Sequence, residues 1–144
     1  MNRRTEKNLV TVLIGLNLAV IWGNSAMTAQ QSGDMSGIIL QWIAEIFPIF
    51  AQEQGHFLLR KLAHFSEFAC LGLLCGMRKL LRGEPIRPSL AGFGLCAACI
   101  DETVQMYIPG RASSLTDVWI DTAGFVTGSL VMNAGYTLYK KVKQ

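Results

Sequence analysis

The sequence predicts an all-α membrane protein: a polytopic helical bundle with four transmembrane helices and a short interfacial or re-entrant helix near residues 38–50. The first observation is composition, because hydrophobic residues make up 51% of the 144-residue chain and charged residues only 16%. An average soluble protein has about 25% charged residues, and a chain of this length has too little interior for so many apolar side chains. We expect one membrane domain over residues 1–144, with its motifs in a core at 57–139.

The second observation is a set of four apolar runs that we expect to cross the membrane. They lie at residues 9–22, 57–77, 89–108 and 115–139. The last three are near the roughly 20 residues that a membrane-spanning helix needs, and the first can extend to Met27. A basic start before an apolar run also fits a secretory signal. The segment 24–29 matches a cleavage site poorly, since Met27 would occupy its −3 position, so we favour an uncleaved helix.

Two segments separate the first run from the second. Residues 23–36 are polar and small, which predicts a loop. Residues 38–50 are mainly apolar, with Gln41 and Glu45 one helical turn apart. This segment is too short to cross a bilayer, so we expect a helix that lies at the membrane interface or dips into it.

Basic residues gather in three places that predict the orientation. They are Arg3, Arg4 and Lys7; Arg78, Lys79, Arg82 and Arg87; and Lys140, Lys141 and Lys143. Because Lys and Arg accumulate in cytoplasmic segments, we predict that both termini and the loop after the second span are cytoplasmic. The loops 23–56 and 109–114 then face outward. Long apolar runs separate the basic clusters, so we expect no nucleic-acid partner.

Polar side chains interrupt the last three spans, although a charge at the centre of a span costs about 2.5–3.5 kcal/mol to insert. They are Arg60, Lys61, His64 and Glu67 in the second span, Asp101, Glu102 and Gln105 in the third, and Asp117 and Asp121 in the fourth. With a rise of about 1.5 Å per residue, Glu67, Asp101 and Asp121 each lie roughly 9–12 Å below the outer surface. Three helices therefore place polar groups at one depth in the outer half of the membrane.

Helical spacing predicts that these groups face the interior of the bundle. Arg60, His64 and Glu67 follow i, i+4, i+7 and share one face. Asp121 shares its face with the small-xxx-small pattern at residues 124–128, which lets another helix approach closely. The polar cluster is therefore expected between helices and not against lipid.

Three interpretations of this cluster stay open: an ion-pair network that locks three spans together, an anion or headgroup site, and a metal site. The spacing His64-x-x-Glu67 suits metal ligands or an acid/base pair. Arg60, Lys61 and Arg111 argue against a metal, because nearby cations repel one. We therefore predict no metal.

We predict no chemistry for the four cysteines or for Ser129. The cysteines are Cys70, Cys75, Cys96 and Cys99, all in apolar stretches. They are interpreted as small hydrophobic residues, because the single C-x-x-C has no second pair to make a metal or redox motif. Ser129 lies roughly 20 Å below the start of the last span, too deep for His64 to activate it. We expect no cofactor.

The loop before the last span carries a helix-capping signal and an isolated arginine. Ser113, Ser114 or Thr116 can cap the following helix. Arg111 is unfavourable near a helix start, so we expect it to pair with an acid or with an external phosphate, the acid being favoured.

Three motifs follow one another along the chain. They are Lys61-x-x-His64-Phe65-x-Glu67-Phe68, then Asp101-Glu102-x-x-Gln105-x-x-x-Pro109-Gly110-Arg111, then Ser114-x-x-Asp117-Val118-x-x-Asp121-x-x-Gly124-x-x-x-Gly128. Over roughly residues 60–128 this order resembles the VanZ-like family of bacterial membrane proteins, although Phe68 stands where Tyr is common. The resemblance implies a multi-pass protein of the bacterial cell membrane and a link to resistance against teicoplanin-type glycopeptides. It implies no particular reaction.

We expect the polar cluster to recognise a lipid headgroup, a cell-wall precursor or a glycopeptide at the outer leaflet. The binding residues would be Arg60, Lys61, Gln105, Arg111, Asp117 and Asp121. The rival is an integral-membrane enzyme acting on a phosphate-bearing or lipid-linked substrate, with His64 or Glu67 as general base and Asp101 or Glu102 as acid or orienting group. A third class, an ion or proton carrier, would need oligomers of so small a bundle.

Overall fold

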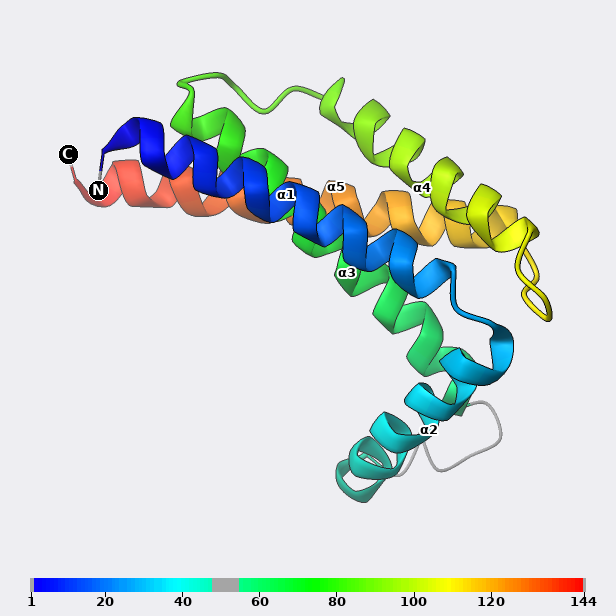
Figure 1. Ribbon diagram of the computed structural model, residues 1–144. Coiled ribbons are helices and arrows are strands. Elements are labelled where there is room, and N and C mark those ends of the chain that lie inside the picture. Colours follow the sequence, from blue (N-terminus) through cyan, green and yellow to red (C-terminus); the bar gives the residue numbers. More distant parts are fainter. Residues whose placement is uncertain (1, 48–54, 144) are drawn as a thin grey trace.

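The computed structural model describes residues 2–47 and 55–143, and this part of the chain is helical without a strand (Figure 1). The helices are α1 (Arg3–Ser25), α2 (Ala29–Ile46), α3 (Gly55–Leu81), α4 (Leu90–Met106) and α5 (Leu115–Val142). The predicted all-α class is confirmed, and the four apolar runs correspond to α1, α3, α4 and α5, although α4 is shorter than its run at 89–108.

Helix α1 begins where Asn2 caps it, since the Asn2 side chain accepts a hydrogen bond from the backbone N–H of Arg4. Its apolar stretch then continues without a charge to Ser25. Among the described helices, α1 alone is long and apolar enough to cross a membrane by length and composition. The prediction of four spans is therefore not established by hydropathy.

Helix α2 corrects the predicted loop at residues 23–36, because the chain is helical from Ala29 onward. A capping box starts it: Thr28 accepts from the backbone N–H of Gln31, and the Gln31 side chain accepts from the backbone N–H of Thr28. This local signal outweighs the polar, glycine-containing composition. The predicted helix at 38–50 is confirmed as far as Ile46, and residues 48–50 lie outside the described residues. Helix α2 projects from the rest of the bundle and packs against α3 (Figure 1).

Helices α3 and α5 form the most extensive pair of the bundle. Gly72, Gly124 and Gly128 lie at their crossing, where an added Cβ would overlap a backbone carbonyl of the facing helix. The predicted small-xxx-small contact is thus confirmed, since only glycine lets the two backbones come so near. Helix α1 packs on α3 and α4, and α4 packs on α5.

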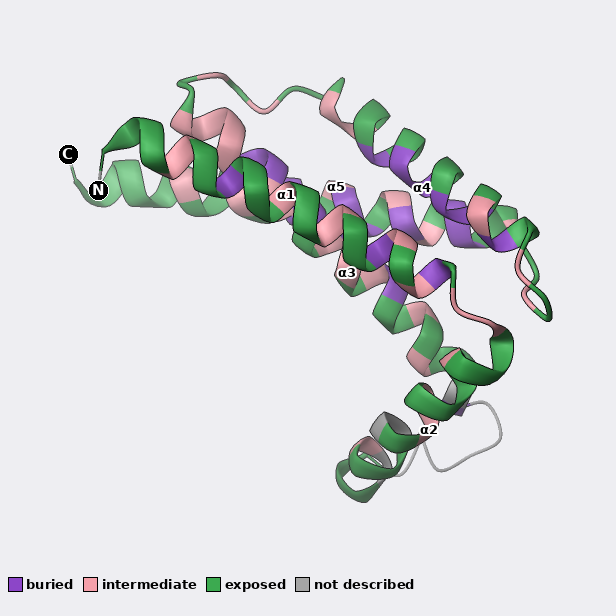
Figure 2. Cartoon of the chain, in the orientation of Figure 1, coloured by how far each residue is buried: buried purple, intermediate pink, exposed green. Residues whose placement is uncertain are grey.

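Buried residues lie where the helices face one another, and exposed residues cover the outside of the bundle (Figure 2). A small apolar core is formed by Ile21, Phe68, Leu71, Cys75, Ala97, Ala98, Val118 and Phe125. Large hydrophobic side chains point outward along α1, where Leu9, Val12, Leu13, Leu16 and Val20 are 38–58% exposed. Carboxylates instead lie inside, and Asp101 and Asp121 have no exposed surface.

The two chain termini lie at the same end of the bundle (Figure 1). There, Arg78 Nε in the last turn of α3 donates to Thr11 Oγ1 of α1 at 2.9 Å. The α1–α2 connection and the α4–α5 loop meet at the opposite end, where the Ala29 N–H donates to the Pro109 carbonyl at 3.5 Å. The functional candidates lie near this second end.

Candidate functional site

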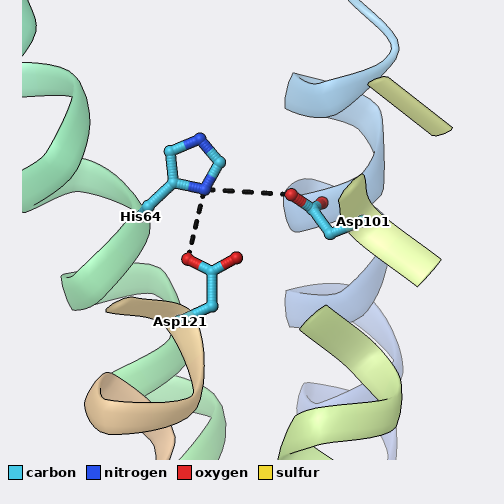
Figure 3. A group of neighbouring side chains, drawn as sticks. All are labelled: His64, Asp101 and Asp121. Atoms are coloured by element: carbon cyan, nitrogen blue, oxygen red, sulfur yellow. Dashed lines mark ion pairs between the residues drawn. The ribbon is translucent and has the colours of Figure 1, made fainter. Parts of the chain in front are cut away.

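Three helices bring His64, Asp101 and Asp121 together, one residue each from α3, α4 and α5 (Figure 3). His64 Nδ1 lies 3.3 Å from Asp121 Oδ1 and 3.8 Å from Asp101 Oδ2. The His64 side chain is 10% exposed, and neither carboxylate is exposed at all. The structure therefore gathers these three groups inside the bundle, as helical spacing predicted.

Asp101 is held by two hydrogen-bond donors. Ser25 Oγ of α1 donates to Asp101 Oδ1 at 2.6 Å, and Gln105 Nε2 donates to Asp101 Oδ2 at 3.0 Å. Gln105 lies one turn later on α4, so it reaches the same face. These bonds orient the carboxylate toward His64.

Glu102 connects α4 to the start of α5. Its Oε2 accepts from the backbone N–H of Ser114 at 2.7 Å, and its Oε1 accepts from Gln105 Nε2 at 3.3 Å. Ser114 is the N-cap of α5, and its side chain accepts from the Thr116 N–H. Capping by Ser114 is thus one of the three predicted options. Both oxygens of this carboxylate are thus engaged, which ties α4 to the start of α5.

Two further predicted residues form an ion pair beside the cluster. Lys61 Nζ of α3 contacts Asp117 Oδ1 in the first turn of α5, and both side chains are largely buried. On the other side of His64, Glu67 Oε1 accepts from Asn24 Nδ2 of α1 at 2.6 Å. These two acids therefore have partners of their own, Lys61 for Asp117 and Asn24 for Glu67, which sequence spacing could not assign.

A groove of about 580 Å³ runs between the end of α1, α2 and the first half of α3. Its polar lining includes Asn24, Ser25, Ser32, Arg60, His64, Glu67 and Arg111, and its apolar lining includes Met27, Met35, Ile43, Leu59, Leu62 and Phe65. Basic, acidic and apolar surfaces thus meet in one concavity.

Arg111 corrects the expectation that it pairs with an acid. Its guanidinium donates to Ser32 Oγ and to the Asn24 carbonyl, each at 3.2 Å. Within the described residues no carboxylate lies in ion-pair distance of it, and its buried Nε has no acceptor. Burial, and after it the nearby charge of Arg60, lowers the pKa of Arg111 from its ordinary value.

The predicted site residues thus divide between three neighbouring places. The buried centre contains His64, Asp101, Asp121, Glu102 and Gln105. Beside it lies the ion pair of Lys61 and Asp117. The groove is lined by Arg60, Glu67 and Arg111, together with His64.

Sequence reasoning missed the contributions of α1 and α2. Asn24 and Ser25 bind Glu67 and Asp101, and Ser32 binds Arg111. Their position in the sequence could have indicated these contacts. Asn24 and Ser25 are the first consecutive polar residues after the apolar run of α1, so they lie level with the cluster. Ser129 is not reactive in this arrangement, since it donates to the carbonyls of Gly72 and Phe125.

Comparison with protein families gives a match to the model described as VanZ/LLP1, over residues 10–137. The chain belongs to the VanZ/LLP1 family. The match includes α1 and α2 as well as the motif-bearing helices, so the groove and the buried centre both lie within the VanZ/LLP1 region. No curated protein and no solved structure matched the chain.

Proposed function

We propose that this VanZ/LLP1 family protein is a multi-pass membrane protein whose groove binds a phosphate-bearing lipid headgroup in the outer leaflet. The main support for the proposal is a groove of about 580 Å³ that is lined both by two arginines, Arg60 and Arg111, and by apolar side chains. An amphiphile with an anionic head matches both surfaces.

Membrane insertion of four helices is supported by the apolar outer surface of the bundle and by its buried carboxylates. Apolar side chains cover the outside of the bundle, as on Leu16 of α1, Ile100 of α4 and Leu130 of α5. In water such a surface would associate or aggregate, whereas in lipid it is the favourable one. Buried polar groups that bind each other are typical of membrane bundles, because lipid offers no hydrogen bonds.

The distribution of basic residues supports an orientation with the groove at the outer leaflet. Both termini lie at one end of the bundle (Figure 1), and that end carries the basic residues expected in the cytoplasm. The groove is at the other end, beside the α4–α5 loop that contains Arg111. A lipid could enter it laterally, between α2 and α3.

The headgroup contact would come from Arg60 and Arg111. The two guanidinium groups repel each other, and a phosphate between them would offset that repulsion. Arg111 also has a buried Nε that no described residue accepts from, and phosphate oxygens are good acceptors for arginine. Leu59 and Leu62 of α3 and Ile43 of α2 would contact the acyl or prenyl chain.

The test uses lipids that differ only in their phosphate. We expect purified protein in detergent to be stabilised by phosphatidic acid or a polyprenyl phosphate, but not by diacylglycerol or the free polyprenol. Arg111→Gln and Arg60→Gln should each weaken binding by about tenfold or more, as for loss of a charge-assisted hydrogen bond.

Arg87→Gln in the α3–α4 loop removes an arginine from the opposite end and should leave binding unchanged. Equal stabilisation by phosphorylated and unphosphorylated lipids would contradict the proposal. Stabilisation by a teicoplanin-type glycopeptide alone would mean that the groove binds a glycopeptide and not a lipid. Only in that case would binding in the groove explain altered teicoplanin susceptibility.

A second candidate function, hydrolysis or transfer at the bound phosphate, is favoured by the position of His64. Its ring lines the groove while buried carboxylates lie behind it, which suits a general base with orienting groups. Release of phosphate from the bound lipid, lost in His64→Gln but with lipid binding retained, would support the enzyme. If the lipid remains intact after prolonged incubation, the enzyme is excluded and the groove only binds the lipid.

A further inference from the structure

We infer that His64, Asp101 and Asp121 form a binding site for one divalent cation that prefers nitrogen and oxygen ligands, such as Mn²⁺ or Zn²⁺. This inference departs from the sequence-based expectation of no metal. It does not depend on lipid binding in the groove.

The geometry of the three ligand atoms suits a single ion. One nitrogen of His64 and one oxygen of each carboxylate all lie within 4.8 Å of one another. The separations from His64 Nδ1 are 3.3 Å and 3.8 Å. Tetrahedral ligands at about 2.0–2.2 Å from a metal are separated by roughly 3.3–3.6 Å, so only small movements would complete the coordination.

Asp121 lacks the partners that a buried carboxylate requires. It has no exposed surface, yet neither of its oxygens accepts a hydrogen bond from any described residue. His64 Nδ1 faces it at ion-pair distance without making a hydrogen bond (Figure 3). An unsatisfied buried charge costs several kcal/mol, and a bound cation would remove that cost for both groups.

Charge balance points to a divalent ion. Two buried carboxylates carry two negative charges, and a histidine that binds a metal is neutral. Two of the fixed cations nearby have other partners, because Lys61 pairs with Asp117 and Arg111 donates to Ser32 and Asn24. One divalent cation would therefore neutralise the two carboxylates that these cations leave unpaired.

The surrounding hydrogen bonds resemble those that orient metal ligands. Ser25 and Gln105 both donate to Asp101 and hold its carboxylate toward His64. Glu67 and Glu102 add negative charge near the centre, but each accepts from another residue. His64 lines the groove, so an ion could enter from that side.

The experiment measures Mn²⁺ binding to the purified, chelator-treated protein by electron paramagnetic resonance, with thermal stability as a second readout. We expect one Mn²⁺ per chain, its displacement by Zn²⁺, and a higher unfolding temperature with either ion. Asp121→Asn and His64→Gln should lower the affinity by about a hundredfold and remove the thermal shift. Ser25→Ala should lower it by about tenfold, because Ser25 orients the ligand Asp101.

Two control variants test whether the ion binds at a different place on the chain. Glu84→Gln changes an exposed carboxylate of the α3–α4 loop and should bind Mn²⁺ normally. Cys96→Ser with Cys99→Ser should do the same, which excludes the thiols of the C-x-x-C segment as ligands. Asp121→Asn keeps the side-chain shape, so its stability without metal should equal or exceed that of the parent protein.

Failure of the parent protein to bind Mn²⁺ or Zn²⁺ at millimolar concentration would overturn the inference. Undiminished binding by Asp121→Asn, or binding lost in the cysteine variant, would overturn it as well. If Asp121→Asn loses the metal but still binds phosphatidic acid, the result supports the metal site independently of the groove. If the parent protein binds metal but no lipid, the result rejects only the proposal for the groove.

Discussion

Lys61 and Asp117 illustrate how individual charges are accommodated in this protein. The pair joins α3 to the first turn of α5, and the two side chains are 14% and 6% exposed. Bringing two charges into a poorly solvated position is costly, so removing only one of them leaves the other without compensation. The interaction is therefore expected to be more important for avoiding an isolated charge than for adding net stability.

Lys61→Met should destabilise the protein by about 3 kcal/mol, because Asp117 would remain buried without its cation. The double variant Lys61→Met with Asp117→Leu should recover most of this loss. Thermal unfolding in detergent, followed by tryptophan fluorescence, measures the difference. Lys141→Met near the exposed C-terminus is the control and should behave like the parent protein. A double variant less stable than the single one would contradict this expectation.

At the scale of secondary structure, the crossing of α3 and α5 determines where the buried side chains meet. Gly124 and Gly128 of α5 face the backbone of Phe65 and Ala69 in α3. The backbones can come this close only because neither glycine has a Cβ. The same approach places His64, which directly precedes Phe65 in α3, beside Asp121.

Gly128→Ala should destabilise the bundle by about 2–3 kcal/mol, since its Cβ would overlap the Ala69 carbonyl and force the helices apart. Gly135→Ala lies later on the same helix with no atom near the added Cβ. It should be neutral or stabilising by up to about 1 kcal/mol, because alanine favours helix more than glycine does. Chemical unfolding of both variants tests the comparison, and equal effects would mean that the close approach is unimportant.

For the whole molecule, the distribution of charge and apolar surface supports one arrangement in the membrane. Basic residues lie at the start of α1, at the end of α5 and in the α3–α4 loop, which together form one end of the bundle. The groove and the buried acids lie toward the opposite end of the bundle. Lys and Arg resist translocation, whereas the opposite end carries few of them. We therefore expect the groove to be open to the outside of the cell.

Single cysteines in the two loops test this topology in a background with the native cysteines changed to serine. Ala112→Cys in the α4–α5 loop should react with a membrane-impermeant maleimide in intact cells. Arg87→Cys in the α3–α4 loop should react only after the cells are opened. The opposite labelling pattern would place the groove inside and reject binding from the outer leaflet.

Much of the fold could be predicted from the sequence because it depends on local interactions. The apolar runs and the candidate caps at Ser113, Ser114 and Thr116 led to three helices whose bounds the structure largely confirms. Helical spacing also placed His64 with Glu67, and Asp121 with the glycines, on common faces. The start of α2 was missed because its capping box lies in a polar segment that resembles a loop.

By itself, the sequence determined most of the helices and which polar side chains share a helical face, since these faces follow from a fixed rotation per residue. The tertiary structure alone decided the partners: Lys61 with Asp117, His64 with Asp101 and Asp121, and Arg111 with no acid in the described chain. The reason is distance. Coulombic and hydrogen-bond partners are selected within a few ångströms, and that selection depends on how helices cross, which no periodicity along one helix specifies.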